Sequence, residues 1–501
     1  MLFGVSEAKM ETPGLDGTLT AVAKALVVRG ARVKLPIMMF ALVLGAYAYF
    51  YQAGGWNQNT RLDLTRAIVE QGTVRIDAYA DNTGDQARKD RHYYCDKAPG
   101  LSWMAVPPYA AIHEFVSLAL AAWFVTVVTV AVPSALACAL FPGLLMAWGV
   151  RVGPAYAAAA GWALATLAWP YGTLFYGHQT VASLLLAAFA LIAVPRACGE
   201  AASPERMAAV GALLGWAVVI EYQAALASAA IASYGVWAHG WRRGAWIAVG
   251  AAPPLIALAA YHWVVFGSPI TTPYRFSNQH SRSQGFFMGI GLPKLEALWG
   301  ILFSEYRGLF YSAPWLGFAL PGGVRLWRAG RRAEVIVCGM IALLFVWLNA
   351  SLVDWEGGWA MGARYLVPCL PFLALLVGGL FTGHRSPALF VVLIAPLSYA
   401  FLAMLAGTAV KPEVDLNVKT PFTSFLYPHF FRGELAVSTQ SIDSAFAPPH
   451  AARQAWNLGN RMGLGGLTSL LPLGLWFCAC GGLLIRGVRR AAPARRSSNF
   501  A

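Results

Sequence analysis

Apolar runs long enough to cross a lipid bilayer recur along the whole of this 501-residue chain. The hydrocarbon core of a bilayer is about 30 Å thick, so a helix of roughly 20 mostly apolar residues spans it. Only 12% of the residues are charged and 58% are hydrophobic, whereas a typical soluble domain is about 25% charged. We therefore expect an all-α polytopic membrane protein rather than a soluble globular fold.

The basic residues between these runs predict how the chain crosses the membrane. Lys and Arg are enriched in cytoplasmic loops, and here they cluster after alternate runs. Runs and basic clusters together predict about twelve transmembrane helices with both termini in the cytoplasm. The expected divisions are a cytoplasmic N-terminal segment at 1–34, a transmembrane domain at 35–486 and a cytoplasmic basic tail at 487–501. Because the net charge of +14 is spread over the loops, no nucleic-acid partner is expected.

A polar stretch, 56–108, follows the first predicted span and lies on the outer side of the membrane by the same rule. It contains seven acidic side chains and seven lysines and arginines. Charge exposed to lipid costs several kcal/mol per group, so this stretch requires water or a charged ligand. We interpret 53–102 as the outer catalytic loop of a membrane enzyme.

The start of this loop carries the pattern of a short helix. Residues 60–63 (Thr-Arg-Leu-Asp) resemble a capping box, and Leu64, Ala67 and Ile68 would share one apolar face. Gly72 is placed to end the helix as its C-cap. These features predict an amphipathic helix that lies on the membrane surface.

The longer polar segments all fall on the predicted outer side: 56–108, 267–308, 351–364 and 409–465. Loops that converge at one end of a helical bundle can form a binding site. The sequence contains no Gly-rich phosphate loop of the Walker type, so ATP-driven chemistry is not expected.

The strongest local pattern is Tyr-Tyr-Cys-Asp-Lys-Ala-Pro-Gly at 93–100. Lys97 follows an acid and enters an apolar run through Pro-Gly, where its ammonium could meet a phosphate at headgroup depth. The competing interpretation is a lysine at a helix start that buries its stem and extends its ammonium to the interface.

The chain places a first span, an acidic outer loop, an amphipathic helix and the Tyr-Tyr-x-x-Lys-x-Pro segment in that order before the next span. This order resembles the GT-C glycosyltransferases that use polyprenyl-phosphate sugars, particularly the aminoarabinose-transferase and protein-mannosyltransferase group (family 39-like). The resemblance implies a multi-pass glycosyltransferase of a bacterial inner (plasma) membrane. It implies a polyprenyl-phosphate sugar as donor, a lipid, glycan or protein as acceptor on the periplasmic side, and membrane lipids as partners. In that family a similar Y-x-x-K-P-P segment brings a lysine to the lipid phosphate, and Lys97 matches that position. No cofactor is assigned, and no metal-ligand spacing indicates a divalent ion.

The resemblance also reveals a difference at the expected base. Proteins of that group often carry an Asp-Glu pair just after the first span, and the Asp serves as general base. Aligned through Arg61, the corresponding residues are Gln58 and Asn59, and an amide cannot act as a base. The base of an inverting transfer would then be another acid of the loop: Asp63, Asp77, Asp85 or Asp96. Asp85, which follows a glycine turn, ranks first, and Asp63, which has capping as its alternative role, ranks second.

A second motif, Trp-Glu-Gly-Gly-Trp-Ala-Met-Gly-Ala-Arg at 355–364, resembles a W-x-G-G-x-x-x-G-x-R segment of bacterial proteins in this class. Arg364 could form a forked contact with a phosphate, and Trp355 or Trp359 could stack on a sugar or an isoprenoid. The alternative is a belt of interfacial tryptophans with a basic anchor. Arg307, close to Glu305 at the start of another span, is either a salt-bridge partner or a further phosphate ligand.

The candidates for substrate binding come from the outer segments and turns: Tyr94, Asp96, Trp355, Glu356, Trp359, His178, Tyr274 and Arg275. His178 and Glu221 stand alone at predicted outer turns, where a solvated or capped residue is more common than a catalyst.

Two other functions compete with a glycosyltransferase. A glycan polymerase or O-antigen-ligase-like enzyme acts on lipid diphosphates and also uses arginines of outer loops, but the acid-rich loop favours the transferase. A transporter predicts charges near mid-span and repeat symmetry, and the predicted spans hold almost no charge.

Overall fold

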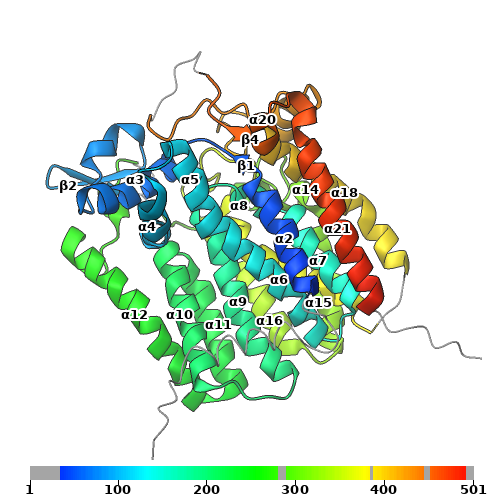
Figure 1. The fold of residues 1–501 in the computed structure, drawn as a ribbon. Coiled ribbons are helices and arrows are strands. Elements are labelled where there is room, and N and C mark those ends of the chain that lie inside the picture. The colour runs from blue at the N-terminus through cyan, green and yellow to red at the C-terminus, as the bar shows by residue number, and fades with distance from the viewer. Residues whose placement is uncertain (1–33, 280–288, 384–386, 445–451, 492–501) are drawn as a thin grey trace, which may run out of the picture.

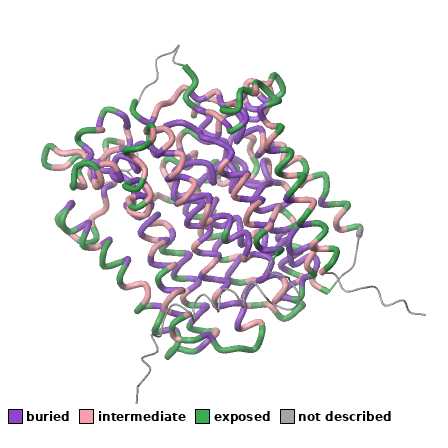
Figure 2. Tube along the Cα trace, in the orientation of Figure 1, coloured by how far each residue is buried: buried purple, intermediate pink, exposed green. Residues whose placement is uncertain are grey.

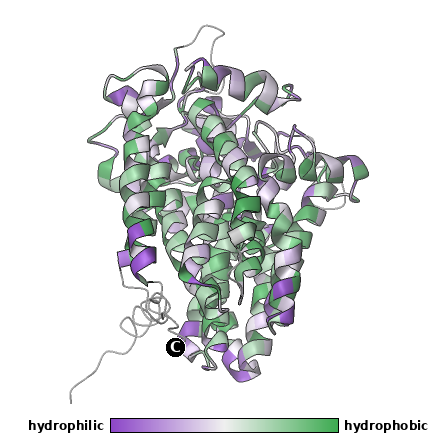
Figure 3. Cartoon of the chain, turned by 90° about the vertical axis from the view of Figure 1, so that its right-hand side faces the viewer, coloured by the Kyte–Doolittle hydropathy of each residue, from purple (hydrophilic) through white to green (hydrophobic). Residues whose placement is uncertain are grey.

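A computed structural model describes residues 34–279, 289–383, 387–444 and 452–491. The protein is mostly helical (71%), and its long helices run side by side in a bundle (Figure 1). Apolar residues fill the middle of the bundle and polar residues collect at its two ends (Figure 3). Of the predicted cytoplasmic segments, 1–33 and 492–501 lie outside the described residues.

Seven helical stretches of the described chain are long and apolar enough to cross a membrane, which makes this an integral membrane protein. They are Leu118–Ala147 (α5, η2 and α6), Gly177–Ala197 (α9), Trp241–Phe266 (α12), Arg332–Ser351 (α16), Arg364–Phe381 (η6, α17 and η7), Ala388–Val410 (in α18) and Gly466–Ala491 (η9 and α21).

The five other runs expected to span form helices of 17 residues or fewer. These are α2 (Lys34–Ala48), α7 (Val152–Leu164), α10 (Pro204–Ile220), α11 (Ala224–His239) and α15 (Ala319–Arg328). Before α15 the chain forms the short helix α14 (Leu309–Ser312) and, from Pro314, the 3-10 turn η5 (Pro314–Phe318). Twelve crossings therefore stay a prediction.

The helix through 118–147 passes a proline without breaking. Pro133 has no N–H, so the carbonyl of Thr129, four residues earlier, loses its usual helical donor. A π-helical stretch at Val127–Ala131 absorbs the irregularity. The Thr180 hydroxyl of α9 donates to that carbonyl over 3.0 Å, so the group is paired inside the bundle.

One hydrophobic core, formed by nearly all of the helices, occupies the bundle. Buried residues concentrate in the central helices, and exposed residues lie on the outer faces, where lipid would contact them (Figure 2). Strand β1 (Phe50–Tyr51) pairs antiparallel with β4 (Trp456–Asn457), just before the short helix α20 (Leu458–Arg461). This pairing ties the end of α2 to the 409–465 segment.

The predicted outer loop 53–102 folds as a compact unit on the end of the bundle. It contains α3 (Trp56–Gln71), the turn η1 (Asp77–Asn82) and the hairpin of β2 (Gln86–Lys89) with β3 (His92–Cys95), and it leads into α4 (Gly100–Ile112). Gly72 ends α3 in the left-handed conformation (φ 65°), as predicted. The predicted apolar face also packs, with Leu64, Ala67 and Ile68 contacting Ile76 and Cys95.

The predicted capping box and the surface position of this helix are wrong. Helix α3 begins at Trp56, so Thr60 and Asp63 lie inside it. Residues 57–65 are buried on every side, although the stretch reads Asn-Gln-Asn-Thr-Arg-Leu-Asp-Leu-Thr. The helix tolerates burial because Gln58, Asn59 and Arg61 find hydrogen-bond partners on segments far away in the sequence.

The predicted outer segments come together at one end of the bundle. Backbone contacts link 56–108 to 267–308, 267–308 to 351–364, and 351–364 to 409–465. The contacts are the bridges Ala87–Ser277 and Ile290–Leu352 and the hydrogen bond from the N–H of Ala360 to the carbonyl of Val414 (2.9 Å). Loops from four parts of the chain thus surround one region.

Candidate functional site

A cavity of about 620 Å³ lies where these outer segments meet the ends of the helices. Its polar and charged lining comprises Asn57, Arg61, Lys97, His178, Glu221, Tyr222, Gln223, His262, Thr272, Tyr274, Asp354, Arg364 and Tyr365. Its apolar lining includes Val218, Leu226, Leu258, Ile270, Ile290, Leu348 and Leu352, mainly from α10, α11, α12 and α16. This size and mixed lining suit a small-molecule site.

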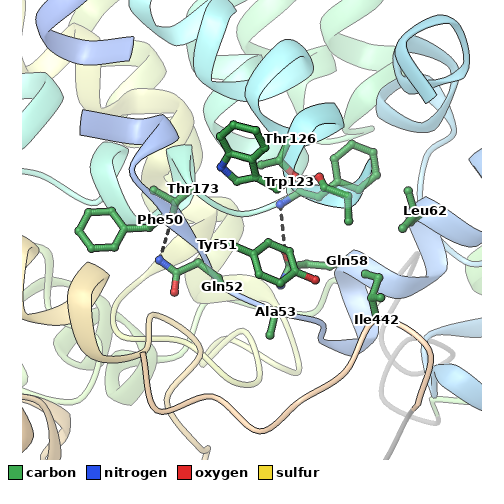
Figure 4. Close-up of a pocket in the computed structure, with 12 residues that line it drawn as sticks. Phe50, Tyr51, Gln52, Ala53, Gln58, Leu62, Trp123, Thr126, Thr173 and Ile442 are labelled. Atoms are coloured by element: carbon green, nitrogen blue, oxygen red, sulfur yellow. Dashed lines mark hydrogen bonds between the residues drawn. The ribbon is translucent and has the colours of Figure 1, made fainter. Parts of the chain in front are cut away.

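Two other cavities lack these features. The space in Figure 4, between β1, the start of α3 and α5, is only about 10 Å³, which is at most the room for one water. Two hydrogen bonds lie beside it: Gln52 donates to the Thr173 hydroxyl (3.0 Å), and the N–H of Phe175 donates to Gln58 (3.1 Å). A groove of about 880 Å³ between α2, α6, α9 and α10 is apolar except for Ser183.

Arg61 and Glu221 form a buried ion pair in the wall of the 620 Å³ cavity, with 2.6 Å between Nη2 and Oε1. Asn57, one turn earlier in α3, accepts from Nε of Arg61 at 3.0 Å, and the carbonyl of Ala98 accepts from Nη1 at 3.4 Å. Nδ1 of His178 lies 3.7 Å from the same Oε1. The expectation that His178 and Glu221 are solvated turn residues is therefore wrong, because both are buried beside a cation.

Lys97 lies between two carboxylates. Its Nζ is 2.6 Å from Oδ2 of Asp85 and 2.9 Å from Oδ1 of Asp96. Gln279 also donates to Asp85, and Ser277 donates to Asp96 (3.2 Å). The Lys97 side chain is buried rather than extended into an interface, which overturns the alternative interpretation of this residue.

Arg364 is a buried cation of a different kind. Its Nη1 donates to the Tyr176 hydroxyl (3.2 Å) and its Nη2 to the Tyr365 hydroxyl (3.5 Å). The guanidinium carbon lies 5.2 Å from the centre of each of these two rings. Within the described ranges no carboxylate lies at ion-pairing distance, and Nε has no hydrogen-bond partner. The cavity wall therefore carries a buried positive charge without a countercharge.

Arg307, predicted as a phosphate ligand, does not line the cavity. Its guanidinium donates to four backbone carbonyls at 2.7–3.0 Å, those of Tyr306, Glu356, Gly358 and Ala360. These bonds hold the 356–360 segment against the residues that directly precede α14. The geometry assigns Arg307 to shaping the loop that leads to Arg364.

The arrangement of helices can be compared with known structures. The chain structurally resembles ArnT. The match to ArnT from Cupriavidus metallidurans, solved with bound undecaprenyl phosphate, has a TM-score of 0.47 and 18% identity over 83% of this chain and 68% of that one. A match to the archaeal oligosaccharyltransferase AglB from Archaeoglobus fulgidus, in complex with an inhibitory peptide and a dolichol-phosphate, has a TM-score of 0.44 and 11% identity over 84% and 61%.

This structural similarity to ArnT and AglB comes with low sequence identity. At such low identities it concerns the arrangement of helices and carries nothing about the substrate of this chain. No protein-family model matches the sequence, and no curated protein matches it either.

Asp63, the second candidate for the base, lies inside α3 and does not line the cavity. One oxygen accepts from Asn82 (2.9 Å), and Oδ2 has no hydrogen-bond partner among the described residues. Burial raises the pKa of the Asp63 carboxyl well above its usual range. A fully buried acid beyond reach of the cavity is poorly placed to take a proton from a substrate.

Of the predicted substrate-binding residues, His178 and Tyr274 line the cavity and the others do not. Tyr94 packs against Phe266, and Trp355 packs edge-on against Tyr306. Arg275 is exposed. Trp359 is 39% exposed, with Nζ of Lys411 4.7 Å above its ring. Glu356 contributes its backbone carbonyl to Arg307, and Asp96 contributes its carboxylate to Lys97.

Sequence reasoning missed a buried acid, Glu413, in the last outer segment. Its Oε1 accepts from the Tyr176 hydroxyl (2.5 Å), and its Oε2 accepts from Gln58 (2.9 Å). Glu413 follows Lys411-Pro in a long polar stretch, so only its distant partners set it apart from surface acids. Tyr222, His262 and Tyr365 were missed as well, since aromatic residues near helix ends suit an interfacial belt equally.

Proposed function

We propose that this protein is an integral-membrane glycosyltransferase that binds a polyprenyl-phosphate sugar in the 620 Å³ cavity. The sugar passes to an acceptor on the outer side of the membrane, where the outer segments meet. The phosphate is held at the charged part of the lining, and the first isoprene units lie on the apolar part.

The observation that carries this proposal is the Arg364 guanidinium, which is buried without a carboxylate partner among the described residues. Burying an unpaired charge costs several kcal/mol, so native proteins pair such groups or use them for ligands. A guanidinium matches a phosphate in shape and charge. The site is therefore suited to an anion, and Lys97 offers a second cation in the same lining.

The apolar lining argues for a lipid-linked anion over a water-soluble one. Leu226, Leu258 and Leu348 reach the cavity from three different helices. A free nucleotide sugar would leave that surface without a partner, whereas an isoprenoid chain would cover it and gain about 25 cal/mol for each Å² of apolar surface removed from water.

The cations would also act in the reaction. When the sugar–phosphate bond breaks, negative charge grows on the leaving phosphate, and fixed cations in a closed site stabilise it. Asp85, the first candidate for the base, has one carboxylate oxygen on Nζ of Lys97. We propose that Asp85 and Asp96 hold Lys97 in position for the phosphate.

Mass spectrometry of membrane lipids tests this function for any sugar, because the mass of the accumulated lipid reports what is attached to it. Cells that lack the protein should accumulate a polyprenyl-phosphate sugar, and expression of the wild type, but not of Arg364→Gln, should clear it. Accumulation of a polyprenyl-diphosphate glycan would instead identify the polymerase or ligase alternative. Unchanged polyprenyl lipids would contradict both functions.

A further inference from the structure

We propose that Glu221 is the carboxylate that takes the proton of the acceptor, in place of an aspartate of the 56–108 loop. This inference rests on the proposed function. The sequence lacks an acid at the position where the resemblance expects the base, since Gln58 stands there and binds Glu413. A carboxylate from another part of the chain is needed if the acceptor is a hydroxyl that must lose its proton.

None of the aspartates of the 56–108 loop lines the cavity. Asp63 lies outside the lining, and Asp85 and Asp96 contact the Lys97 ammonium. Asp354 lines the cavity but is exposed at the end of α16. Glu221 is the buried carboxylate among the lining residues that the structure describes.

The backbone holds Glu221 in one place. The residue lies in the tight turn between α10 and α11, where its N–H donates to the carbonyl of Ala217 (3.0 Å). Its own carbonyl accepts from the N–H of Ala224 (2.9 Å). This double anchoring fixes the point from which the side chain enters the cavity.

The side chain is held just as firmly, but through one oxygen only. Oε1 receives Nη2 of Arg61, which Asn57 and the carbonyl of Ala98 hold in turn. Oε2 has no hydrogen-bond partner in the parts of the chain that the structure describes, and the carboxylate forms part of the cavity wall. One oxygen is thus anchored while the other remains able to accept a proton.

Glu221 and Arg364, the cation proposed to bind the phosphate, occupy separate points of the same cavity wall. His178 lies between them: its Nδ1 is 3.7 Å from Glu221, and its ring meets the Tyr365 ring edge-on at 5.5 Å. Arg364 lies over that same Tyr365 ring. A displacement at the anomeric carbon needs such a separation, because the acceptor and the leaving phosphate occupy opposite sides of the sugar.

The step balances as follows. The acceptor hydroxyl gives its proton to Oε2 of Glu221, and its oxygen forms a bond to the anomeric carbon. The bond from that carbon to the phosphate oxygen breaks, and its electron pair stays on the phosphate. The products are a glycosylated acceptor, a polyprenyl phosphate held by Arg364 and Lys97, and a proton that leaves Glu221 for water.

Glu221→Gln tests the inference in cells and with purified protein. The glutamine keeps the size of the side chain and an oxygen for Arg61 but cannot accept the proton. We expect clearance of the accumulated donor lipid to slow by about 10²–10⁴-fold, the usual contribution of a general base. Binding of undecaprenyl phosphate by the purified variant should persist. Asp63→Asn, outside the cavity, is the matched control and should clear the lipid normally.

The double variant Arg61→Met with Glu221→Gln distinguishes a purely structural role of the Arg61–Glu221 ion pair from a role of Glu221 as base. Removing both charges together leaves no unpaired buried ion, so the double variant should fold and bind undecaprenyl phosphate. If Glu221 is the base, clearance stays lost; if the pair only stabilises the fold, clearance returns and the inference is wrong. Normal clearance by Glu221→Gln alone would also overturn it. Failure of the wild type to bind undecaprenyl phosphate would instead refute the proposed function.

Discussion

The Arg364 guanidinium is linked to the Tyr176 hydroxyl by a hydrogen bond of 3.2 Å, and both groups are buried at the junction of the outer segments with the helices. The Tyr176 hydroxyl donates its own hydrogen bond to Glu413 over 2.5 Å. Burial raises the pKa of Glu413, which weakens this acid as a countercharge. The positive charge of Arg364 is therefore available to a ligand.

The two arginines of this region should respond oppositely to substitution. Arg307→Gln removes hydrogen bonds from a charged donor to carbonyls that cannot find other partners, and such bonds contribute about 1.5–3 kcal/mol each. We expect a marked drop in the thermal unfolding temperature in detergent. Arg364→Gln removes an unpaired charge, so its unfolding temperature should equal or exceed that of the wild type. Equal destabilisation by the two substitutions would contradict this assignment.

Asp63 should make stability depend on pH. Burial holds the folded-state pKa above the value of about 3.9 expected in the unfolded chain. The folded state therefore binds the proton more tightly, and stability is greatest below about pH 4 and falls as pH rises through the folded pKa. Asp63→Asn should remove this contribution. Unfolding temperatures of both proteins across the pH range should converge at low pH and diverge, in favour of the variant, as pH rises. Parallel curves would show that Asp63 is not the source.

Asp85→Asn should tighten the binding of undecaprenyl phosphate. Asparagine keeps an acceptor for Lys97, whose Nζ lies 2.6 Å from the native carboxylate, but it removes a negative charge from beside the phosphate site. The measurement is the dissociation constant of undecaprenyl phosphate for the purified variant. Weaker binding would mean that the Asp85 charge is needed to place Lys97. Unchanged binding with lost lipid clearance would return Asp85 to the role of base.

Membrane orientation can be tested with thiol reagents, but not through Cys95. That thiol is fully buried, and its pKa is raised to about 11, chiefly by burial. Asp81→Cys places a thiol at an exposed position of η1. The native Cys198 is exposed just after the C-terminal end of the 21-residue helix α9, whereas the N-terminal end of that helix carries His178 of the cavity wall. An impermeant maleimide should label Asp81→Cys in intact spheroplasts and label Cys198 only after permeabilisation. The reverse labelling pattern would show that the 56–108 loop faces the cytoplasm and that the predicted topology is wrong.

Much of this architecture could be predicted from local patterns. Hydrophobic runs indicate the spans, Gly72 marks the end of α3, and the polar segments indicate which loops converge. These features depend on residues close together in the sequence or on the overall alternation of apolar and basic segments.

The site itself depends on contacts that no local pattern contains. Glu221 lies 160 residues from Arg61, and Glu413 lies 355 residues from Gln58. Without knowledge of these partners, the sequence predicts a solvated turn residue at Glu221 and a surface helix at α3. Arg307 and Arg364 also look alike in sequence, since each begins a predicted span, and only their partners reveal that one is saturated by carbonyls.

Binding of undecaprenyl phosphate to the purified protein in nanodiscs tests the central claim most directly, with the uncharged undecaprenol as control. The wild type should bind the phosphate and not the alcohol, because the buried Arg364 charge needs an anion. Arg364→Gln, which we expect to be at least as stable as the wild type, should lose that preference. Equal binding of the two lipids by the wild type, or an unchanged preference in Arg364→Gln, would contradict a lipid-phosphate site in this cavity.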